Sequence, residues 1–236
     1  MDQQFLTVAE RTAIDNGPWF SGLSRTLRHD LYRCATIERY KDGDLIVARD
    51  EQPEAWMACA KGAIRIGSSK GFGRECTLTY VEPGAWFGEV SILDGERHTH
   101  DAYAHGASTV VCIATADFRN TMTRHVELRD ALLRLHARRI RHLYGMVDDL
   151  NTLPLRARLA KQLLRLVRRY GVRSFSDDNE VRLGITLAQE NLAQLLGASR
   201  QRVNMELKAM ERADVIRVKP GGLVIRDHAA LVQLVG

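Results

Sequence analysis

The chain has 236 residues, of which 45% are hydrophobic and 27% are charged, and this balance is that of a soluble globular protein. It excludes a disordered, fibrous or collagen-like chain. Lys and Arg number 34 against 29 Asp and Glu, and the resulting net charge of +5 permits a polyanionic partner without requiring one. Because the sequence has neither a membrane-length apolar run nor an export leader, we expect a cytoplasmic protein with reduced cysteines and no membrane partner.

The first half of the chain predicts short helices followed by many short strands. Helices are expected over Val8–Thr12 and Arg25–Ala35, around a turn at residues 16–18. From about Ile37 to Ala114, apolar runs of strand length are bounded by Gly, Pro or Asp; the runs are GDLIV, WMACAKGAIRIG, CTLTYVEPGAWFGEVSILDG and STVVCIA. This spacing predicts a small antiparallel barrel or sandwich.

After Ala114 the apolar period becomes helical. Between Val126 and Leu150, β-branched residues and leucines recur at heptad spacing, which favours a parallel two-stranded pairing of helices. The first heptad position holds Val126, Leu133, Ile140 and Val147, and the second holds His136, Leu143 and Leu150. We therefore predict a homodimer through this helix, while Leu128, Leu132 and Leu135 on the flanking face pack on the protein's own barrel.

A break at Pro154 separates this helix from a new helical segment over 155–170, because proline removes a backbone donor and clashes with the preceding turn. One side of the new segment is basic and carries Arg156, Arg158, Lys161, Arg165, Arg168 and Arg169. The chain is accordingly divided into a barrel domain at 1–124, a dimerisation helix and hinge at 125–152, and a C-terminal domain at 153–236.

The C-terminal domain contains a helix-turn-helix pattern. Thr186 and Gln189 have the spacing of a capping box that opens a helix. Further on, Ala193 permits close helix approach, Gly197 permits a left-handed turn, and Val203 packs between the two helices. This combination predicts two helices crossing around a tight turn.

The second of these helices carries side chains suited to base edges. Ser199 is a good N-cap for it, and its exposed side begins with Arg200, Gln201, Arg202 and Asn204. Arginine pairs with guanine, while glutamine and asparagine pair with adenine. The following IRVKPGGLVIRD segment predicts two strands of a wing that carries Arg217 and Lys219. The alternative is an ordinary helical hairpin with a solvated polar face; the combined pattern favours DNA binding.

From Trp19 onward the chain resembles the CRP/FNR family of bacterial transcription regulators. The resemblance is strongest in PGAWFGEVSILDG (Pro83–Gly95) and LAQLLGASRQRVN (Leu192–Asn204). It implies an α+β fold with an N-terminal antiparallel β-barrel of the jelly-roll, cyclic-nucleotide-binding type, a long dimerisation helix and a C-terminal winged helix-turn-helix. It also implies a homodimeric, sequence-specific regulator that is gated by a small-molecule effector. Its implied partners are near-palindromic double-stranded DNA and RNA polymerase.

The resemblance also assigns two sets of site residues. The implied DNA-binding residues are Thr186, Ser199, Arg200, Gln201, Arg202, Asn204, Lys208 and Lys219. The implied effector-binding residues are Gly88, Glu89, Val90, Arg97, His98, Thr99 and Tyr144, where Gly88 and Glu89 would hold a cyclic phosphate and ribose.

The effector site departs from the cyclic AMP pattern of the family. His98 stands where the phosphate-binding arginine is usual, and Arg97, one place earlier, would face the opposite side of a strand. Leu143 and Tyr144 replace a Thr-Ser pair that contacts the base. We therefore expect cyclic AMP to be a poor effector, and cyclic di-GMP, another ligand or no ligand are the alternatives. Arg138, Arg139 and Arg141 are interpreted as a solvated helix face rather than a ligand site.

Other cofactors and activities have little support in the sequence. Cys34 stands alone before the barrel, so no iron–sulfur cluster is expected. The neighbouring His98, His100 and His105 are interpreted as polar strand residues, and no metal or haem is expected. A nucleotide-processing enzyme using Glu89, Asp94 and Asp101 is the remote alternative. Because no nucleophile–base pair or phosphate loop accompanies these carboxylates, we expect no enzymatic activity.

Overall fold

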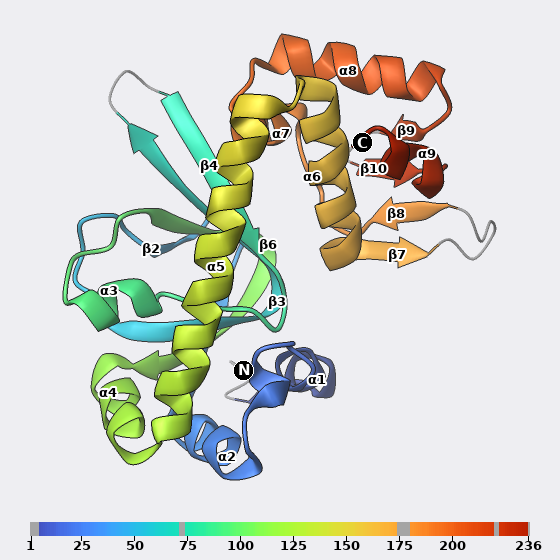
Figure 1. The fold of residues 1–236 in the computed structure, drawn as a ribbon. Helices are drawn as coiled ribbons and strands as arrows, with labels where there is room; N and C mark the ends of the chain where they lie inside the picture. Colours follow the sequence, from blue (N-terminus) through green and yellow to red (C-terminus); the bar gives the residue numbers. More distant parts are fainter. Residues whose placement is uncertain (1–4, 71–73, 174–179, 220–221, 236) are drawn as a thin grey trace. The chain divides into compact units, whose positions relative to one another are not determined.

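The computed structural model describes residues 5–70, 74–173, 180–219 and 222–235 (Figure 1). The chain forms two compact units, Met1–Arg141 and His142–Gly236. The expected fold class is confirmed, because the first unit contains an antiparallel sheet, the second contains a helix-turn-helix, and a long helix runs from one to the other. The domain limits expected at 124 and 152 stay a prediction.

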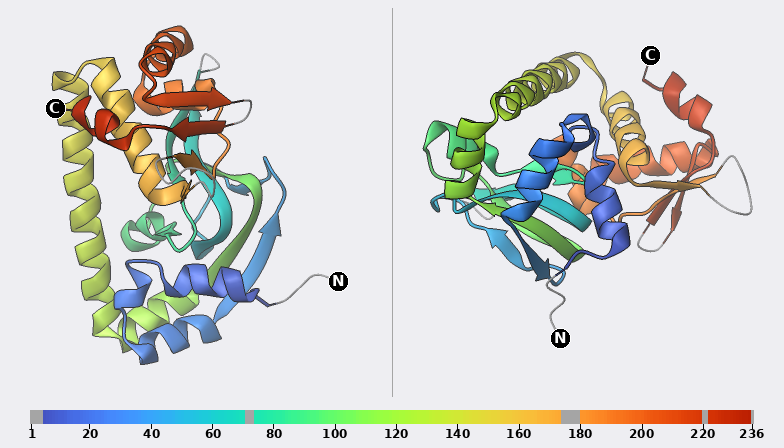
Figure 2. Two further views of the ribbon diagram at one scale, coloured as in Figure 1. Left: turned by 90° about the vertical axis from the view of Figure 1, so that its right-hand side faces the viewer. Right: turned by 90° about the horizontal axis from the view of Figure 1, so that it is seen from below.

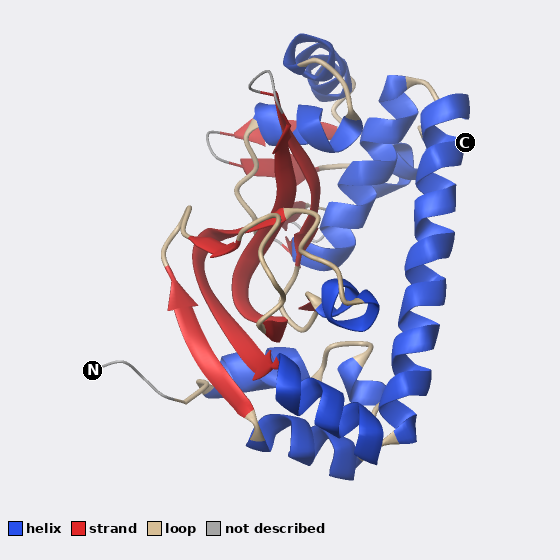
Figure 3. Cartoon of the chain, turned by 90° about the vertical axis from the view of Figure 1, so that its left-hand side faces the viewer, coloured by secondary structure: helices blue, strands red, loops and turns tan. Residues whose placement is uncertain are grey.

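The first unit consists of a curved antiparallel sheet with helices gathered at one end (Figure 3). The sheet order is β1-β6-β3-β4, with β2 paired to β6 and β5 paired to β3. Its helical elements are α1 (Val8–Asp15), η1 (Phe20–Gly22), α2 (Arg25–Arg33), α3 (Glu89–Asp94) and α4 (Thr115–Arg124). Its strands are β1 (Ala35–Tyr40), β2 (Leu45–Val47), β3 (Ala55–Lys70), β4 (Arg74–Val81), β5 (Trp86–Phe87) and β6 (Asp101–Ala114).

The core of this unit lies between the sheet and the helices. Trp56 and Phe118 are completely buried, and the Trp86 ring packs against the Trp56 ring at a centroid distance of 4.1 Å. The aromatic cluster extends to Phe20 on the N-terminal segment, which stacks on Trp86. The apolar runs expected to form strands therefore bury an aromatic-rich core under the helices, and a second buried cluster includes Met57, Ile64 and Val110.

One segment of the predicted strand region is helical instead. Residues 89–94 form α3, because Gly88 and Gly95 both have positive φ and bound the segment at its two ends. Residues 95–100 then form a loop before β6. The expectation that Arg97, His98 and His100 alternate along a strand is therefore wrong.

The long helix α5 (Val126–Thr152; yellow-green in Figure 2) has the two faces that its sequence predicts. Leu128 and Leu132 are buried against the first unit's core, and Leu135 packs partly buried beside them. The heptad residues on the other face are 48–69% exposed within the chain. We call this face the apolar seam; its members are Val126, Leu133, Ile140, Leu143, Val147 and Leu150.

The second unit is built around α6, which begins immediately after the break at Pro154. Its four-stranded sheet has the order β7-β8-β10-β9, and the two wing strands expected around residues 220–221 are present as β9 and β10. Its helices are α6 (Leu155–Tyr170), α7 (Gln189–Leu196), α8 (Arg200–Arg212) and α9 (His228–Gln233). Its strands are β7 (Gly171–Arg173), β8 (Val181–Leu183), β9 (Ile216–Lys219) and β10 (Gly222–Ile225).

Candidate DNA-binding surface and effector cradle

The turn between α7 and α8 has the geometry that the sequence predicts. Gly197 ends α7 with φ +58°, a left-handed conformation that favours glycine. The Ser199 hydroxyl then accepts a hydrogen bond from the Arg202 amide at 3.3 Å and so caps α8. On the inner side of α8, Val203 and Leu207 are at most 1% exposed. The recognition helix is thus held at its start by a cap and along its length by the core.

The outer side of α8 is polar at its first turn. Arg200, Gln201 and Arg202 are exposed there, and Lys208 is exposed further along the helix. Asn204 is half-buried, and its side-chain oxygen accepts a hydrogen bond of 3.4 Å from the side-chain nitrogen of Gln189. The structure therefore gathers the five residues expected to contact DNA on α8 onto one helix, whose amide end favours an anion.

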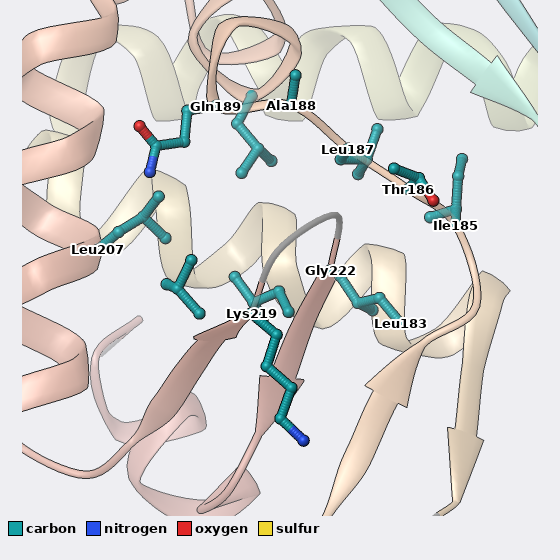
Figure 4. Close-up of a pocket in the computed structure, with 12 residues that line it drawn as sticks. Leu183, Ile185, Thr186, Leu187, Ala188, Gln189, Leu207, Lys219 and Gly222 are labelled. Atoms are coloured by element: carbon teal, nitrogen blue, oxygen red, sulfur yellow. The ribbon is translucent and has the colours of Figure 1, made fainter.

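Thr186 does not cap α7, which corrects the prediction made from its spacing. The helix begins at Gln189 with Ala188 in the cap position, and the Asn191 side chain accepts a hydrogen bond of 3.2 Å from the Ala188 amide. Thr186 lies earlier, on the extended segment that lines an apolar pocket beside α8 (Figure 4). A capping pattern read from spacing alone fixes the helix start only to within a few residues.

Several basic residues of the second unit are engaged inside it. Arg158 donates to the Leu196 carbonyl at 2.9 Å, at the end of α7. Lys161 lies 2.6 Å from a carboxylate oxygen of Asp149, and Arg165 lies 3.6 Å from the other oxygen. The basic side of α6 therefore joins α6 to α7 and to the end of α5. In the wing, Arg217 lies 3.8 Å from Glu180, whereas Lys219 is exposed.

In the first unit, the turn at Gly88–Val90, which we call the effector cradle, contains a buried carboxylate. Glu89 is 0% exposed, and Arg139 of α5 donates to its Oε1. The second guanidinium nitrogen of Arg139 donates to the Trp86 carbonyl at 2.6 Å. His136 Nε2 lies 3.7 Å from Glu89 Oε1. Glu89 Oε2 has no hydrogen-bond partner among the described residues, so a polar acceptor remains inside the cradle.

Arg139 is not solvated as the sequence was interpreted, whereas Arg138 and Arg141 are exposed. Arg139 follows Leu128, Leu132 and Leu135 at helical spacing, on the stripe of α5 that faces the barrel. The spacing of this barrel-facing stripe thus contained a signal for the contact, which the interpretation of Arg139 as solvated overlooked. A buried carboxylate needs a charged or hydrogen-bonding partner, and Arg139 is that partner of Glu89.

Three of the other predicted effector residues, Arg97, His98 and Thr99, lie on the loop after α3. Arg97 is exposed and donates to the Asp50 carbonyl at 2.7 Å. His98 is buried, and burial lowers the pKa of its imidazole although the nearby Glu51 acts in the opposite direction. The lowered pKa favours the neutral ring. The Thr99 hydroxyl lies 2.8 Å from His100 Nδ1.

Two further predicted effector residues are surface residues. Val90, the last residue of the cradle, is 50% exposed. Tyr144 is 68% exposed on the part of α5 that belongs to the second unit. Among the predicted effector residues, all of which lie in the described part of the chain, only Glu89 has a charged side chain that is buried in the cradle.

The cysteines, the possible metal ligands and the helix lengths bear on cofactors and on membrane association. The four cysteines are free thiols in the structure, and burial raises the pKa of Cys59 and Cys112 to about 12. Within residues 5–70, 74–173, 180–219 and 222–235, no group of three or more His, Cys, Asp or Glu side chains is placed to hold a metal ion. Among the same residues, no helix has the length and apolar character needed to cross a membrane.

Comparison with known proteins matches both units to described domains. Residues 37–125 match the cyclic nucleotide-binding domain, and residues 157–234 match the Crp-like helix-turn-helix domain. The chain is 31% identical over 191 residues to the CRP-like cAMP-activated global transcriptional regulator of Mycobacterium tuberculosis, covering 81% of this chain and 84% of that protein. It is 28% identical over 195 residues to the cyclic AMP receptor protein of Thermus thermophilus, covering 83% and 86%. The solved structure of FixK2 from Bradyrhizobium japonicum is similar with a TM-score of 0.75 and 22% identity, covering 86% of this chain and 98% of that one.

Proposed function

This chain belongs to the CRP/FNR family of DNA-binding transcription regulators, and from that premise we propose that it is a homodimer that binds near-palindromic DNA under the control of an effector in its barrel. Its named relatives are transcription regulators rather than enzymes. We further propose that this protein interacts with RNA polymerase and is located in the cytoplasm. The observation that carries the proposal is the capped, polar first turn of α8.

The proposed DNA contacts divide into two kinds. Arg200, Gln201 and Arg202 stand exposed at the N-terminus of α8, the end that helix-turn-helix proteins present to base edges. Lys208 and Lys219 offer exposed ammonium groups, which suit phosphate and give binding its salt dependence. Ser199 acts through its cap, and Asn204 is oriented by Gln189. Thr186 is assigned to the DNA sugar–phosphate backbone, because this exposed residue lies on the segment that precedes α7.

The proposed homodimer rests on the apolar seam. Six large apolar side chains in register along one helix face would otherwise stand in water, whereas pairing with the same face of a second copy buries them. A symmetric dimer presents two copies of α8 and matches a site with two-fold symmetry.

For the effector, we propose a ligand that engages the Glu89 carboxylate and for which cyclic AMP is a weak substitute. The relatives named above are named for cyclic AMP, but here Arg97 donates to the Asp50 carbonyl and burial favours neutral His98. A cyclic phosphate would therefore lack the bidentate cationic partner that arginine supplies. Cyclic di-GMP remains the alternative ligand.

Two experiments test this function. Selection from a random DNA pool is expected to enrich a near-palindromic site bound by two chains with steep salt dependence; failure to enrich any site would contradict DNA recognition. Calorimetric titration with cyclic AMP, cyclic GMP and cyclic di-GMP tests the effector. Saturable cyclic AMP binding at micromolar strength would contradict the proposed weakness.

A further inference from the structure

The exposed face of α8 carries a large apolar side chain at its centre. Met205 is 64% exposed, although the apolar residues Val203, Leu207 and Met210 of the same helix are buried. Gln201 precedes Met205 by four residues and Lys208 follows it by three, so the three side chains share one face. Met205 thus lies between two of the residues proposed to contact DNA.

Neighbouring side chains leave Met205 uncovered. Asn204, the residue before it, is half-buried and bonded to Gln189 of α7. Gln189 extends from the start of α7 toward α8 (Figure 4). The polar contact between α7 and α8 therefore involves Asn204, while the thioether of Met205 remains on the solvent-exposed side of the helix.

The chemistry of this side chain restricts what it can recognise. In the major groove, guanine and adenine present acceptors to a protein donor, and thymine presents a C5-methyl group. The Met205 side chain has no hydrogen-bond donor, and its long, polarisable chain suits an apolar contact. A polar base edge placed against it would lose its water without gaining a partner.

We propose that Met205 is a specificity-determining residue that selects thymine in each half-site through contact with the thymine methyl group. This inference rests on the proposed function, because it requires α8 to lie in the major groove. It adds to that function a base preference produced by an apolar contact rather than by a hydrogen bond.

The test removes the methyl group and the side chain separately. The DNA site is first selected with the wild-type protein. Its thymines are then replaced by deoxyuridine one position at a time, and each replacement is made in both half-sites. At one position, the wild-type protein is expected to lose about fourfold in affinity per half-site, the equivalent of about 0.8 kcal/mol for one buried methyl group. Met205→Gln, which has similar length, is expected to bind the thymine and deoxyuridine sites equally.

Two control variants accompany this comparison. Met205→Leu keeps an apolar side chain and is expected to retain the sensitivity to deoxyuridine. Lys208→Ala is expected to weaken binding to both DNAs by the same factor. Because Met205 is exposed, the melting temperatures of the Met205 variants are expected to match that of the wild type.

The outcomes separate the inference from the function on which it rests. If no site is enriched by the wild type, the proposed DNA-binding function fails. If a site is enriched but deoxyuridine is tolerated at every position, or if Met205→Gln keeps the full sensitivity, the thymine contact is refuted. Non-additive effects of the protein and DNA changes at one position support it.

Discussion

Arg139 on α5 donates to the buried carboxylate of Glu89 at the start of α3, and this ion pair ties the long helix to the effector cradle. The same guanidinium holds the Trp86 carbonyl, so one side chain joins α5 to two neighbouring elements of the barrel. An effector that engages Glu89 must therefore bind beside Arg139 or displace it. Either event changes the contacts that position α5 on the barrel.

Removal of Arg139 leaves a buried carboxylate without its cationic partner. We expect Arg139→Met to lower the free energy of unfolding of the first unit by about 3 kcal/mol, because an uncompensated buried charge is costly. Urea denaturation followed by tryptophan fluorescence measures this loss. Arg138→Met, at the exposed neighbouring position, is the matched control and is expected to have little effect.

The double variant identifies the cause of that loss. Once Glu89→Gln has removed the carboxylate, Arg139→Met is expected to cost less than it does in the wild type. Strictly additive losses would show that Arg139 acts through packing and not through the ion pair.

Glu10 makes the stability of the first unit depend on pH. Burial would raise its pKa, but hydrogen bonds from Arg39, the Thr7 amide and Thr109 outweigh burial and lower the pKa from 4.5 to about 2. The pKa of Glu10 is lower in the folded state than in the unfolded chain. Its contribution to the free energy of unfolding is therefore complete above the unfolded-state pKa and is lost as the pH falls through the folded-state pKa. We expect a loss on the order of 3 kcal/mol between about pH 5 and about pH 2.

Denaturation of Glu10→Gln over this pH range measures that contribution. The variant is expected to be less stable near neutral pH and to show a shallower decline in acid. Glu96→Gln, at an exposed position, should follow the wild-type profile. A Glu10→Gln profile parallel to that of the wild type would refute the assignment.

The apolar seam predicts how the chain assembles. We expect Val147→Asp to convert a dimer to a monomer, because a charge would be buried at the centre of the paired helices. Light scattering coupled to size-exclusion chromatography measures the mass directly. Arg138→Asp changes charge on the same helix outside the seam and should leave the dimer intact; a dimeric Val147→Asp protein would count against pairing through this face.

Two substitutions of Ser199 distinguish its role as a helix cap from its proposed proximity to DNA. Ser199→Ala is expected to destabilise the second unit by about 1 kcal/mol through loss of the cap. Ser199→Asp keeps a capping oxygen and therefore stability, but its negative charge should weaken DNA binding most strongly at low salt. Thermal melting and fluorescence anisotropy report the two effects. Unchanged DNA affinity of the Asp variant would mean that the start of α8 lies away from phosphate.

The spacing of apolar and capping residues along the sequence was sufficient to predict the features that lie within a single helix. The spacing of Leu128, Leu132 and Leu135 predicted the barrel-facing side of α5, and Ser199 and Val203 predicted the cap and the buried side of α8. Each of these features depends on neighbours along the same helix, which sequence spacing encodes directly.

Contacts between distant segments were not predictable in the same way. The partner of Arg139 lies 50 residues earlier, and only the folded barrel brings Glu89 to it. The short helix α3 lay within an apolar run of strand-like composition, where its bounding glycines were its main signal. Thr186 had the right spacing for a cap, but the chain stays extended to Ala188, so the local pattern did not decide the helix start.

Recognition of DNA by the first turn of α8 is tested most directly by the specificity ratio of Arg200→Ala, which is its affinity for the selected site divided by its affinity for unrelated DNA. Fluorescence anisotropy gives the affinities for the selected palindrome and for a scrambled duplex at fixed salt. We expect Arg200→Ala to reduce this ratio at least about fivefold, since one good base contact contributes about 1–3 kcal/mol of discrimination. Lys219→Ala should weaken both affinities alike. A ratio for Arg200→Ala equal to that of the wild type would contradict the assignment of α8 as the recognition helix.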